Sequence, residues 1–226
     1  MANIVCECEH KHQIIVVQFM RYRKIPDETI RRLPIYLRGV LFLSAQGQQS
    51  TSSRNLADFL GVNSWQIRKD FSYFGDFGTR GVGYNVEKLT KQIKKILKLD
   101  AVHKAALVGV GNLGSVVLAY PGFRTYGFDI AAAFDNNPKK IGKKIRNLTI
   151  EDVSNLPMLK KRKINLAIIA VPGDAAQQTA DALVKAGVKG ILNFSPCYIT
   201  VAKKVKVITI DIAMDIARLP YYMPAG

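Results

Sequence analysis

The residues of this sequence with the clearest chemical potential are three glycines, Gly109, Gly111 and Gly114, in the pattern G-x-G-x-x-G. They follow an apolar segment with strand character and precede a segment of small residues with helix character. In that setting the first glycine permits a tight turn, the second lets the main chain approach a pyrophosphate, and the third allows close helix packing. Unpaired N–H groups at the helix N-terminus then favour an anion. The pattern therefore predicts a dinucleotide site with these cofactor-binding residues: Gly109, Val110, Gly111, Asn112, Leu113 and Gly114.

A carboxylate follows the next apolar strand: Asp135 lies 21 residues after the last glycine of the pattern. An acid at this place accepts hydrogen bonds from ribose hydroxyls and repels a 2′-phosphate. We therefore expect NAD (NADH and NAD+) as the cofactor, although Lys139 and Lys140 keep NADP as an alternative. Val171 and Pro172, which follow a later strand, complete the expected cofactor site. A glycine turn that binds no ligand is the competing interpretation.

A dehydrogenase needs more than a nucleotide site. The histidines are His10, His12 and His103, and none lies beyond the glycine pattern. Cys197 has no histidine base near it in the sequence, so we expect a small buried side chain rather than a nucleophile. The residues from Ala101 onward suffice for the nucleotide-binding domain and leave no room for a substrate domain. We expect no enzymatic activity and no catalytic residue.

Residues 26–98 indicate a different chemistry. Helices are expected from Asp27 to Ala45 with a kink at Pro34, over a short segment ending at Leu60, over 65–74 with Ser64 as its cap, and over 86–99. Four glycines between residues 75 and 83 suit a two-stranded hairpin. This order is typical of a winged helix, in which the second helix of the helix-turn-helix enters the major groove of DNA.

Polar and apolar residues share the expected recognition helix. Its apolar side chains are expected to turn toward the core: Trp65, Ile67, Phe71 and Phe74. Gln66 and Lys69 suit base edges in the major groove. The remaining candidates suit the DNA phosphates: Ser64, Arg68, Tyr73 and Arg80. A helical protein-interaction module with a solvated basic face is the alternative.

The elements that must position the glycine pattern form a regular alternation. Strands are expected over 105–108, 128–134, 166–171, 190–194 and 205–210, and helices over 115–119 and 174–186. Apolar strands that alternate with helices indicate a parallel sheet covered on both faces. The expected fold class is α/β, with an N-terminal winged helix-turn-helix domain and a C-terminal doubly wound parallel (Rossmann) sheet.

Four segments follow from this organisation. Residues 1–24 form an extension, 25–100 the winged-helix DNA-binding domain, 101–210 the Rossmann dinucleotide-binding domain, and 211–226 a tail that can contact a second subunit. In the extension, two cysteines and two histidines lie close together: Cys6, Cys8, His10 and His12. Their spacing differs from that of the usual zinc fingers, so we expect no metal.

Composition limits the class of protein. The 226 residues are 48% hydrophobic, and 33 Lys and Arg against 17 Asp and Glu give a formal charge of +16, which favours an acidic polymer as partner. The excess is spread over both halves of the chain and does not locate the site. Apolar runs are far shorter than the roughly 18 residues that span a bilayer, so we expect no membrane contact. Three cysteines are too few for a disulfide framework and indicate a cytoplasmic protein.

Several motifs together resemble the family of the redox-sensing transcriptional repressor Rex, over residues 25 to about 219. They are LPIYLR at 33–38, QIRKDFSYFG at 66–75, GTRGVGY at 78–84, the glycine pattern at 109–114, YPGF at 120–123, FD at 134–135, GILNF at 190–194 and ID at 210–211. The resemblance implies a homodimer that binds double-stranded operator DNA and is released when NADH replaces NAD+. It also implies a polar network that couples the two domains: Arg38, Tyr120 and Asp211.

The sequence departs from the family pattern in three places, of which the first is residues 1–24, which lie outside that pattern. Asn137 stands where the family often has a second acid, and Ile212 stands where an aromatic residue usually follows the acid matched to Asp211. Pro220 and Pro224 interrupt a tail that family members usually exchange between subunits as a long helix. The rival interpretation is a Rossmann-type enzyme or a CoA-binding domain fused to a helical interaction module.

Overall fold

A computed structural model describes residues 25–79 and 81–223 of the chain. The chain divides into two compact units between Ile93 and Lys94. The division falls inside helix α4 (Val86–Ile96). Each unit has its own buried core. Residues 1–24, for which we expect no metal, lie outside the described residues.

The N-terminal unit is built from α1 (Asp27–Ala45), α2 (Ser53–Leu60), α3 (Ser64–Ser72) and α4, with two short strands, β1 (Ser50–Thr51) and β2 (Tyr84–Asn85). Its core consists of fully buried side chains at helical spacing: Leu33, Tyr36, Leu37 and Val40 of α1, Leu56 of α2, Ile67 of α3, and Leu89 and Ile93 of α4. Burial of these stripes holds the helices together because short helices are marginal alone. Helix α1 continues through Pro34.

The helix caps of this unit agree with the sequence except at one position. Ser52 caps α2 by accepting a hydrogen bond from the Asn55 N–H, and Gly61 ends that helix in the left-handed conformation. Helix α3 is capped by Asn63, whose Oδ1 accepts from the Trp65 N–H at 2.8 Å. The prediction of Ser64 as the cap is therefore wrong, because Ser64 is already the first helical residue.

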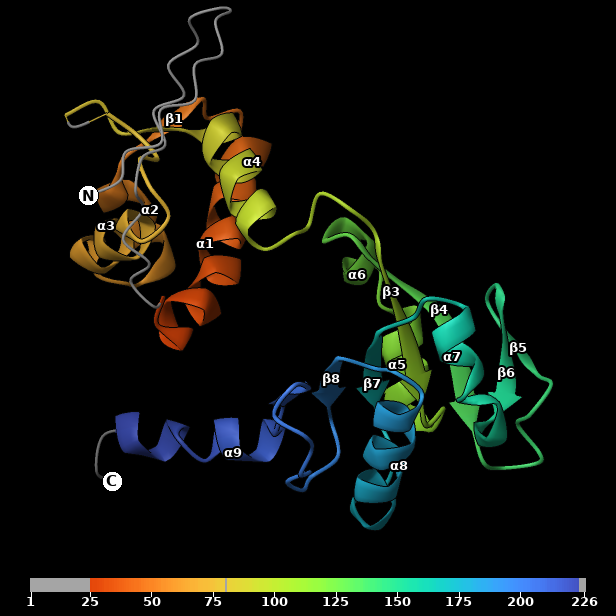
Figure 1. The fold of residues 1–226 in the computed structure, drawn as a ribbon. Coiled ribbons are helices and arrows are strands. Elements are labelled where there is room, and N and C mark those ends of the chain that lie inside the picture. Colours follow the sequence, from red (N-terminus) through yellow and green to blue (C-terminus); the bar gives the residue numbers. More distant parts are fainter. Residues whose placement is uncertain (1–24, 80, 224–226) are drawn as a thin grey trace, which may run out of the picture. The chain divides into compact units, whose positions relative to one another are not determined.

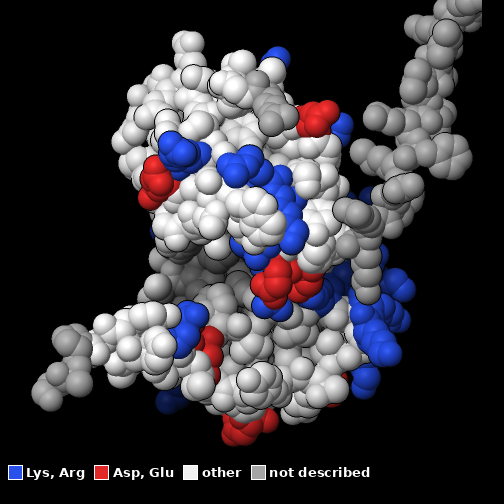
Figure 2. Space-filling model, turned by 90° about the vertical axis from the view of Figure 1, so that its left-hand side faces the viewer, with Lys and Arg blue, Asp and Glu red and all other residues white. Residues whose placement is uncertain are grey.

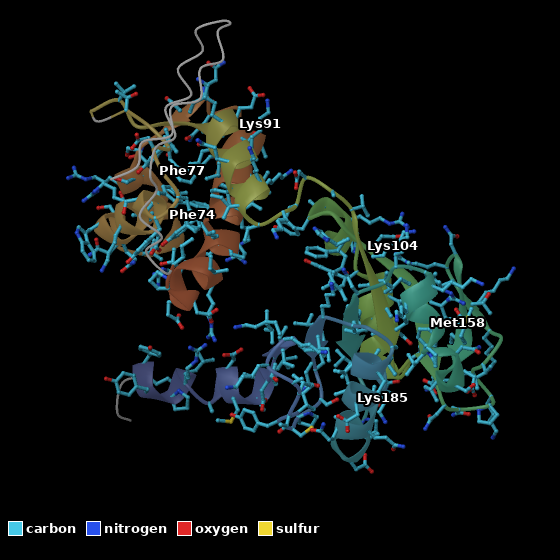
Figure 3. All side chains as sticks on the ribbon, in the orientation of Figure 1. Phe74, Phe77, Lys91, Lys104, Met158 and Lys185 are labelled. Atoms are coloured by element: carbon cyan, nitrogen blue, oxygen red, sulfur yellow. The ribbon has the colours of Figure 1, made fainter. Side chains whose placement is uncertain are left out.

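The expected hairpin between residues 75 and 83 is reduced to a single bridge, between Thr79 and Gly83. Strand β2 instead pairs antiparallel with β1, which precedes α2, so that Thr51 lies opposite Tyr84. The segment after α3 is thereby hydrogen-bonded to the strand that precedes α2. Phe77 stacks on Phe71 of α3 with ring centroids 4.5 Å apart, and Figure 3 labels Phe74 and Phe77 on the segment that leads from α3 toward α4.

The described C-terminal residues form a seven-stranded sheet in the order β5-β6-β4-β3-β7-β8-β9. The strands are β3 (His103–Val108), β4 (Phe128–Asp135), β5 (Lys144–Ile145), β6 (Leu148–Asp152), β7 (Leu166–Ile169), β8 (Gly190–Asn193) and β9 (Lys206–Thr209). Strands β6, β4, β3, β7, β8 and β9 run parallel to one another. Strands β3 and β4, which come first in the chain among the strands of this sheet, lie at its centre. This confirms the doubly wound sheet.

Helices cover the two faces of this sheet (Figure 1). On one face, Leu159 of α7 (Met158–Lys161) and Leu183 of α8 (Gly173–Lys185) pack with Val108 and Phe134 of the strands. On the other face, Val117 of α5 (Asn112–Ala119) packs with the intervening strand residues, such as Leu107 and Ala133. Because successive strand residues point to opposite faces, a strand covered on both faces must be apolar throughout.

Several short elements were not expected from the sequence. Strands β5 and β6 pair antiparallel as a hairpin, so that the sheet has one antiparallel edge. Arg146 in the hairpin turn has a φ of 53°. The others are the helices α6 (Gly122–Thr125), α7 and α9 (Ile212–Ile216) and the 3-10 turns at Val153–Asn155 and Leu219–Tyr222. Elements of four or five residues carry too little periodicity to be recognised.

Candidate functional site

The glycine loop lies where the strand order reverses. Strand β3 has β4 on one side and β7 on the other, and the chain segments that follow β3 and β7 both lead into helices, α5 and α8. Loops that diverge in this way open a crevice at the carboxyl ends of the strands, where doubly wound sheets bind ligands. Gly109 to Gly111 follow β3, and Val171 and Pro172 follow β7.

The three glycines of the loop have three different surroundings. Gly109 has a φ of 93°, and a Cβ on it would come within 2.5 Å of the Ala170 carbonyl oxygen. A Cβ on Gly114 would come within 2.0 Å of the Gly109 carbonyl oxygen, where α5 packs on the loop. The first and third glycines are therefore required by the fold itself.

Gly111 is different, because a Cβ on it would meet no atom within 4 Å. Its backbone is extended and any residue could adopt it. Gly111 is the N-cap of α5, and no side chain caps the N–H groups at this helix end. A glycine that the fold does not need leaves space in front of unpaired N–H groups, which fits the phosphates of a dinucleotide.

Asp135 ends β4 with its side chain almost completely buried. Its Oδ2 accepts hydrogen bonds from the Val110 N–H at 2.8 Å and from Lys140 Nζ at 3.1 Å, and its Oδ1 accepts from the Asn137 N–H at 2.9 Å. Burial acts to raise the pKa of Asp135, but the hydrogen bonds from Asn137, Val110 and Lys140 outweigh it and lower the pKa. The carboxylate is therefore ionised, and it also holds the glycine loop.

A cavity of about 610 Å³ lies at this crevice. It brings together most of the expected cofactor residues, namely Gly109, Gly111, Asp135, Val171 and Pro172. Polar residues that the sequence did not single out also line it: Asn136, Asp152, Ser154 and Gln178. Asp152 ends β6 and Ser154 follows it, and the sequence did not predict this strand, so no signal placed them here. Asn112 and Leu113 lie at the exposed start of α5.

The rim of the cavity beyond β7 is held by a polar network. Ser195 Oγ donates to the Val171 carbonyl at 2.6 Å, and fully buried Asn193 donates to the Cys197 carbonyl at 2.9 Å. Cys197 is half-buried with its Sγ 3.5 Å from the Gly173 carbonyl oxygen. The described part of the chain has no group of three or more His, Cys, Asp or Glu side chains that could hold a metal ion.

A second candidate site lies on α3 of the N-terminal unit. Arg68 and Lys69 are exposed, and Ser64, Gln66 and Tyr73 are half-buried. Arg68 donates to Ser53 Oγ on α2 at 2.9 Å. Arg80 lies outside the described residues. The exposed side chains of α3 are available to a ligand that binds along this helix.

Trp65 does not face the core as predicted. Its exposed fraction is 54%, whereas Ile67 and Phe71 are buried and Phe74 is half-buried. Lys69 Nζ lies 4.7 Å from the Trp65 ring centroid, one turn further along the helix. The exposed ring therefore makes a cation–π contact with Lys69, because a Lys ammonium is attracted to the face of an indole.

The buried carboxylate of Asp70 connects α3 to α1. It accepts hydrogen bonds from Arg32 at 2.6 and 2.8 Å, from Tyr36 at 2.6 Å, from Thr29 at 2.9 Å and from Gln66 at 2.9 Å. Burial acts to raise the pKa of Asp70, but these hydrogen bonds, led by that from Arg32, lower it to about 2. The carboxylate also raises the pKa of Arg32 and, together with burial, that of Tyr36.

The sequence reasoning missed Asp70, although a signal was present. Asp70 lies three residues after Ile67 and next to Phe71, on the buried face of α3. A charge on an apolar face must be paired because its desolvation is costly. Arg32 and Tyr36, four residues apart on α1, are the pair that meets it.

On the face drawn in Figure 2, the basic residues lie in more than one place. Figure 2 shows Lys and Arg in several separate groups on the face that it draws, with Asp and Glu beside some of them. Part of the positive charge of the chain is therefore ordinary solvated surface. Across residues 25–79 and 81–223, no helix has both the length and the apolar character needed to cross a membrane.

The three residues expected to couple the domains lie in both units. Arg38 is exposed on α1 of the N-terminal unit. Tyr120 follows α5 and is 59% exposed, with its ring packed edge to face on Phe123 at 5.6 Å. Asp211 caps α9, since its Oδ1 accepts from the N–H groups of Ala213 and Met214.

A winged helix-turn-helix unit and a doubly wound sheet with an open glycine loop define the class of DNA-binding proteins that carry a dinucleotide-binding domain. Comparisons with known proteins agree with this class. Residues 24–72 match the family described as putative DNA-binding protein N-terminus, and residues 100–197 match the CoA binding domain family.

Relatives and solved structures extend the likeness to most of the chain. A redox-sensing transcriptional repressor Rex from Chloroflexus aurantiacus is 45% identical over 88% of this chain and 94% of its own length. A Rex from Carboxydothermus hydrogenoformans is 45% identical over 89% of this chain and 98% of its own. The chain belongs to the Rex family of redox-sensing transcriptional repressors.

Two crystal structures of RSP, a Rex-family repressor, are similar to this chain. The complex of RSP with beta-NAD+ and operator DNA has a TM-score of 0.83 and 38% identity, covering 88% of this chain and 92% of that one. The complex of RSP with beta-NADH has a TM-score of 0.80 and 36% identity, covering 88% and 94%.

Proposed function

We propose that this chain is a homodimeric transcriptional repressor that binds operator DNA through its winged-helix domain and leaves it when NADH replaces NAD+. The observation that carries the proposal is the space in front of Gly111, a glycine that the fold does not need but a bound pyrophosphate does. RSP, a relative of the same family, binds beta-NAD+ together with operator DNA. The chain is a repressor of the Rex family and not an enzyme.

The cofactor residues act by binding and positioning. The N–H groups of Gly111, Asn112 and Leu113, at the start of α5, would hold the pyrophosphate. Asp135 would accept from the ribose, because three donors leave part of its lone-pair capacity open. The nicotinamide ring, which loses its charge on reduction, supplies the difference between the two redox states.

The DNA contacts divide between base edges and phosphates. Gln66 and Lys69 would meet base edges, since they lie on the helix expected to enter the major groove. The cations and hydroxyls around them would contact phosphates: Ser64, Arg68, Tyr73 and Arg80. Because each phosphate contact releases counterions, the affinity should fall steeply with salt.

Exposed apolar surface in the C-terminal unit supports a dimer. Leu113, Val116 and Tyr120 are exposed along α5 at helical spacing. The segment after Asp211 is also apolar and exposed, at Ile212, Met214, Ile216 and Leu219. Monomeric proteins rarely expose apolar patches of this kind, so we propose that a second copy covers them.

Coupling would run through Arg38, Tyr120 and Asp211, which lie in different units and carry groups that can pair across a subunit contact. One dimer geometry spaces the two recognition helices for successive major grooves, and another does not. A shift from mostly bound to mostly free needs only a few kcal/mol of differential affinity between NAD+ and NADH. We place this repressor in the cytoplasm, where it could reach its operator DNA.

Coenzyme A is a second candidate ligand, because residues 100–197 match the CoA binding domain family. Coenzyme A and NAD share an adenosine and a pyrophosphate, so the glycine loop alone does not separate them. The buried Asp135 carboxylate favours a ligand with free ribose hydroxyls over one with a phosphate on its ribose. Calorimetry with NAD+, NADH, NADPH and coenzyme A distinguishes these ligands.

The function is tested with the full chain and a duplex that it selects from a pool of random palindromes. Retardation of this duplex is measured at one salt concentration with NAD+ or with NADH. We expect binding with NAD+ and at least tenfold weaker binding with NADH. Equal binding in both would contradict redox sensing, and selection of no duplex would contradict DNA binding.

A further inference from the structure

The Gln66 side chain is hydrogen-bonded at one end to a buried carboxylate. Gln66 lies in the first turn of α3, and its Nε2 donates to Asp70 Oδ1 at 2.9 Å, one helical turn further on. Asp70 is fully buried, whereas Gln66 is half-buried. The amide thus spans from the interior to the surface of the helix that the proposed function assigns to the major groove.

The charge of Asp70 decides which end of the amide faces inward. Its other partners, Thr29, Arg32 and Tyr36, all donate to it, and the Arg32 guanidinium pairs with it at 2.6 Å. An ionised carboxylate only accepts hydrogen bonds. If the Gln66 amide turned by 180°, its Oε1 would face the Asp70 oxygen, two acceptors without a proton between them. Nε2 therefore faces inward.

The outward side of the Gln66 amide then has a defined pattern. Oε1 receives no hydrogen bond from the described residues, and Nε2 keeps its second N–H. An acceptor beside a donor complements the N6 amino group and N7 of adenine in the major groove, the pairing that Gln and Asn side chains make there. Guanine offers two acceptors at the same edge and would face Oε1 with one of them.

We propose that Gln66 reads an adenine in each operator half-site and that Asp70 is the positioning residue that sets the orientation of its amide. The proposal rests on the proposed function and deepens it, because it names a base and the residue that determines the specificity. Asp70 acts on DNA only through Gln66. It also ties α3 to α1, so its structural role has to be separated from its role in specificity.

The experiment measures base preference rather than affinity alone. The duplex selected by the wild-type chain is compared with a series in which each base pair is replaced in turn. We expect one A·T pair per half-site whose replacement costs the wild type about tenfold or more. Gln66→Met should reduce this preference to less than twofold and leave the preferences at the other pairs unchanged.

Asp70→Asn should weaken the preference for the same A·T pair, because an amide at position 70 lets the Gln66 amide turn. In a Gln66→Met background, Asp70→Asn should have no further effect on base preference. Tyr36→Phe is the matched control: it removes another hydrogen bond to Asp70 and leaves Gln66 alone. We expect it to change the affinity for all duplexes by the same factor.

Thermal unfolding of each variant identifies those that fold. If Asp70→Asn does not fold, Gln66→Glu tests the base contact with Asp70 intact, because an acceptor-only side chain, which turns away from the Asp70 carboxylate, should replace the adenine preference with one for cytosine. Retained adenine preference in Gln66→Glu or in folded Asp70→Asn would overturn the proposal. The proposal would also be overturned if Gln66→Met weakened the preference at a pair other than A·T. Failure of the wild type to select any duplex would instead overturn DNA binding, and this proposal with it.

Discussion

The main-chain N–H of Val110 donates a 2.8 Å hydrogen bond to Asp135 Oδ2, which joins the glycine loop after β3 to the end of β4. Both residues are buried. The carboxylate thus has two roles, since it holds the loop and would also face the ribose of a bound nucleotide. Substitution of Asp135 should change both the stability and the choice of cofactor.

Asp135→Ala should lower the free energy of unfolding by about 1–3 kcal/mol, because the buried Val110 N–H loses its partner. NADH affinity should fall while NADPH affinity holds or rises, since repulsion of a 2′-phosphate is lost. Thermal unfolding and calorimetry with both cofactors measure these effects. Asp129→Ala, at the more exposed start of β4, is the control and should change neither. Unchanged NADH binding in Asp135→Ala would mean that its carboxylate does not contact the ribose.

Asp70 should make the N-terminal unit sensitive to acid. Its pKa in the folded chain is about 2, below the ordinary value of 3.8, so its stabilisation is complete above about pH 4 and is lost as the pH falls toward 2. The loss should be on the order of 2 kcal/mol. The only tryptophan, Trp65, reports unfolding of α3 by fluorescence.

Asp70→Asn, where it folds, should remove most of this pH dependence, and Asp58→Asn, at an exposed site on α2, should retain it. An acid titration of Asp70→Asn that coincides with that of the wild type would show that another carboxyl group is responsible.

Lys163 is expected to cost stability because it occupies a left-handed conformation, with a φ of 56°, after the end of α7. The Ile164 N–H closes the turn on the Leu159 carbonyl. Lys163→Gly should raise the free energy of unfolding by about 0.5–1 kcal/mol, because glycine adopts positive φ without strain. Lys161→Gly, within α7, should lower it. Thermal unfolding of the two variants should therefore shift in opposite directions.

Arg68 and Lys69 are neighbours on α3 and should affect DNA binding differently. Arg68→Ala should weaken binding to all duplexes and reduce the slope of affinity against salt by about one unit. Lys69→Ala should cost about 1–3 kcal/mol on the operator and little on random DNA. Retardation assays at several salt concentrations measure both. Equal losses for Lys69→Ala on operator and random DNA would exclude a contact with a base edge.

Asp211→Ala should weaken the response of DNA binding to NADH while leaving NADH binding intact. The substitution also removes the cap of α9, so a second variant is needed. Asp211→Ser keeps a capping side chain but no charge. If coupling needs the carboxylate, both variants reduce the ratio of operator affinities measured with NAD+ and with NADH. If only Asp211→Ala reduces it, the helix cap is what matters.

The sequence by itself determined the order of the two domains, the helices α1 to α4 and the parallel strands β3, β4, β7, β8 and β9. These elements are set by local signals: the period of the apolar residues, caps such as Ser52 and glycine turns such as Gly61. The glycine pattern and Asp135 were also visible, because their spacing within a strand-turn-helix unit is local information.

Only the tertiary structure decided what those residues contact. It showed that Gly111 is the glycine the fold does not need, that Asp135 holds the Val110 N–H, and that Asp70 meets Arg32 from another helix. It also showed that Asn63, and not Ser64, caps α3, and that β2 pairs with β1. These facts depend on atoms far apart in the chain that meet only after folding. A periodic pattern reports which face of an element is buried, but not which distant partner covers it.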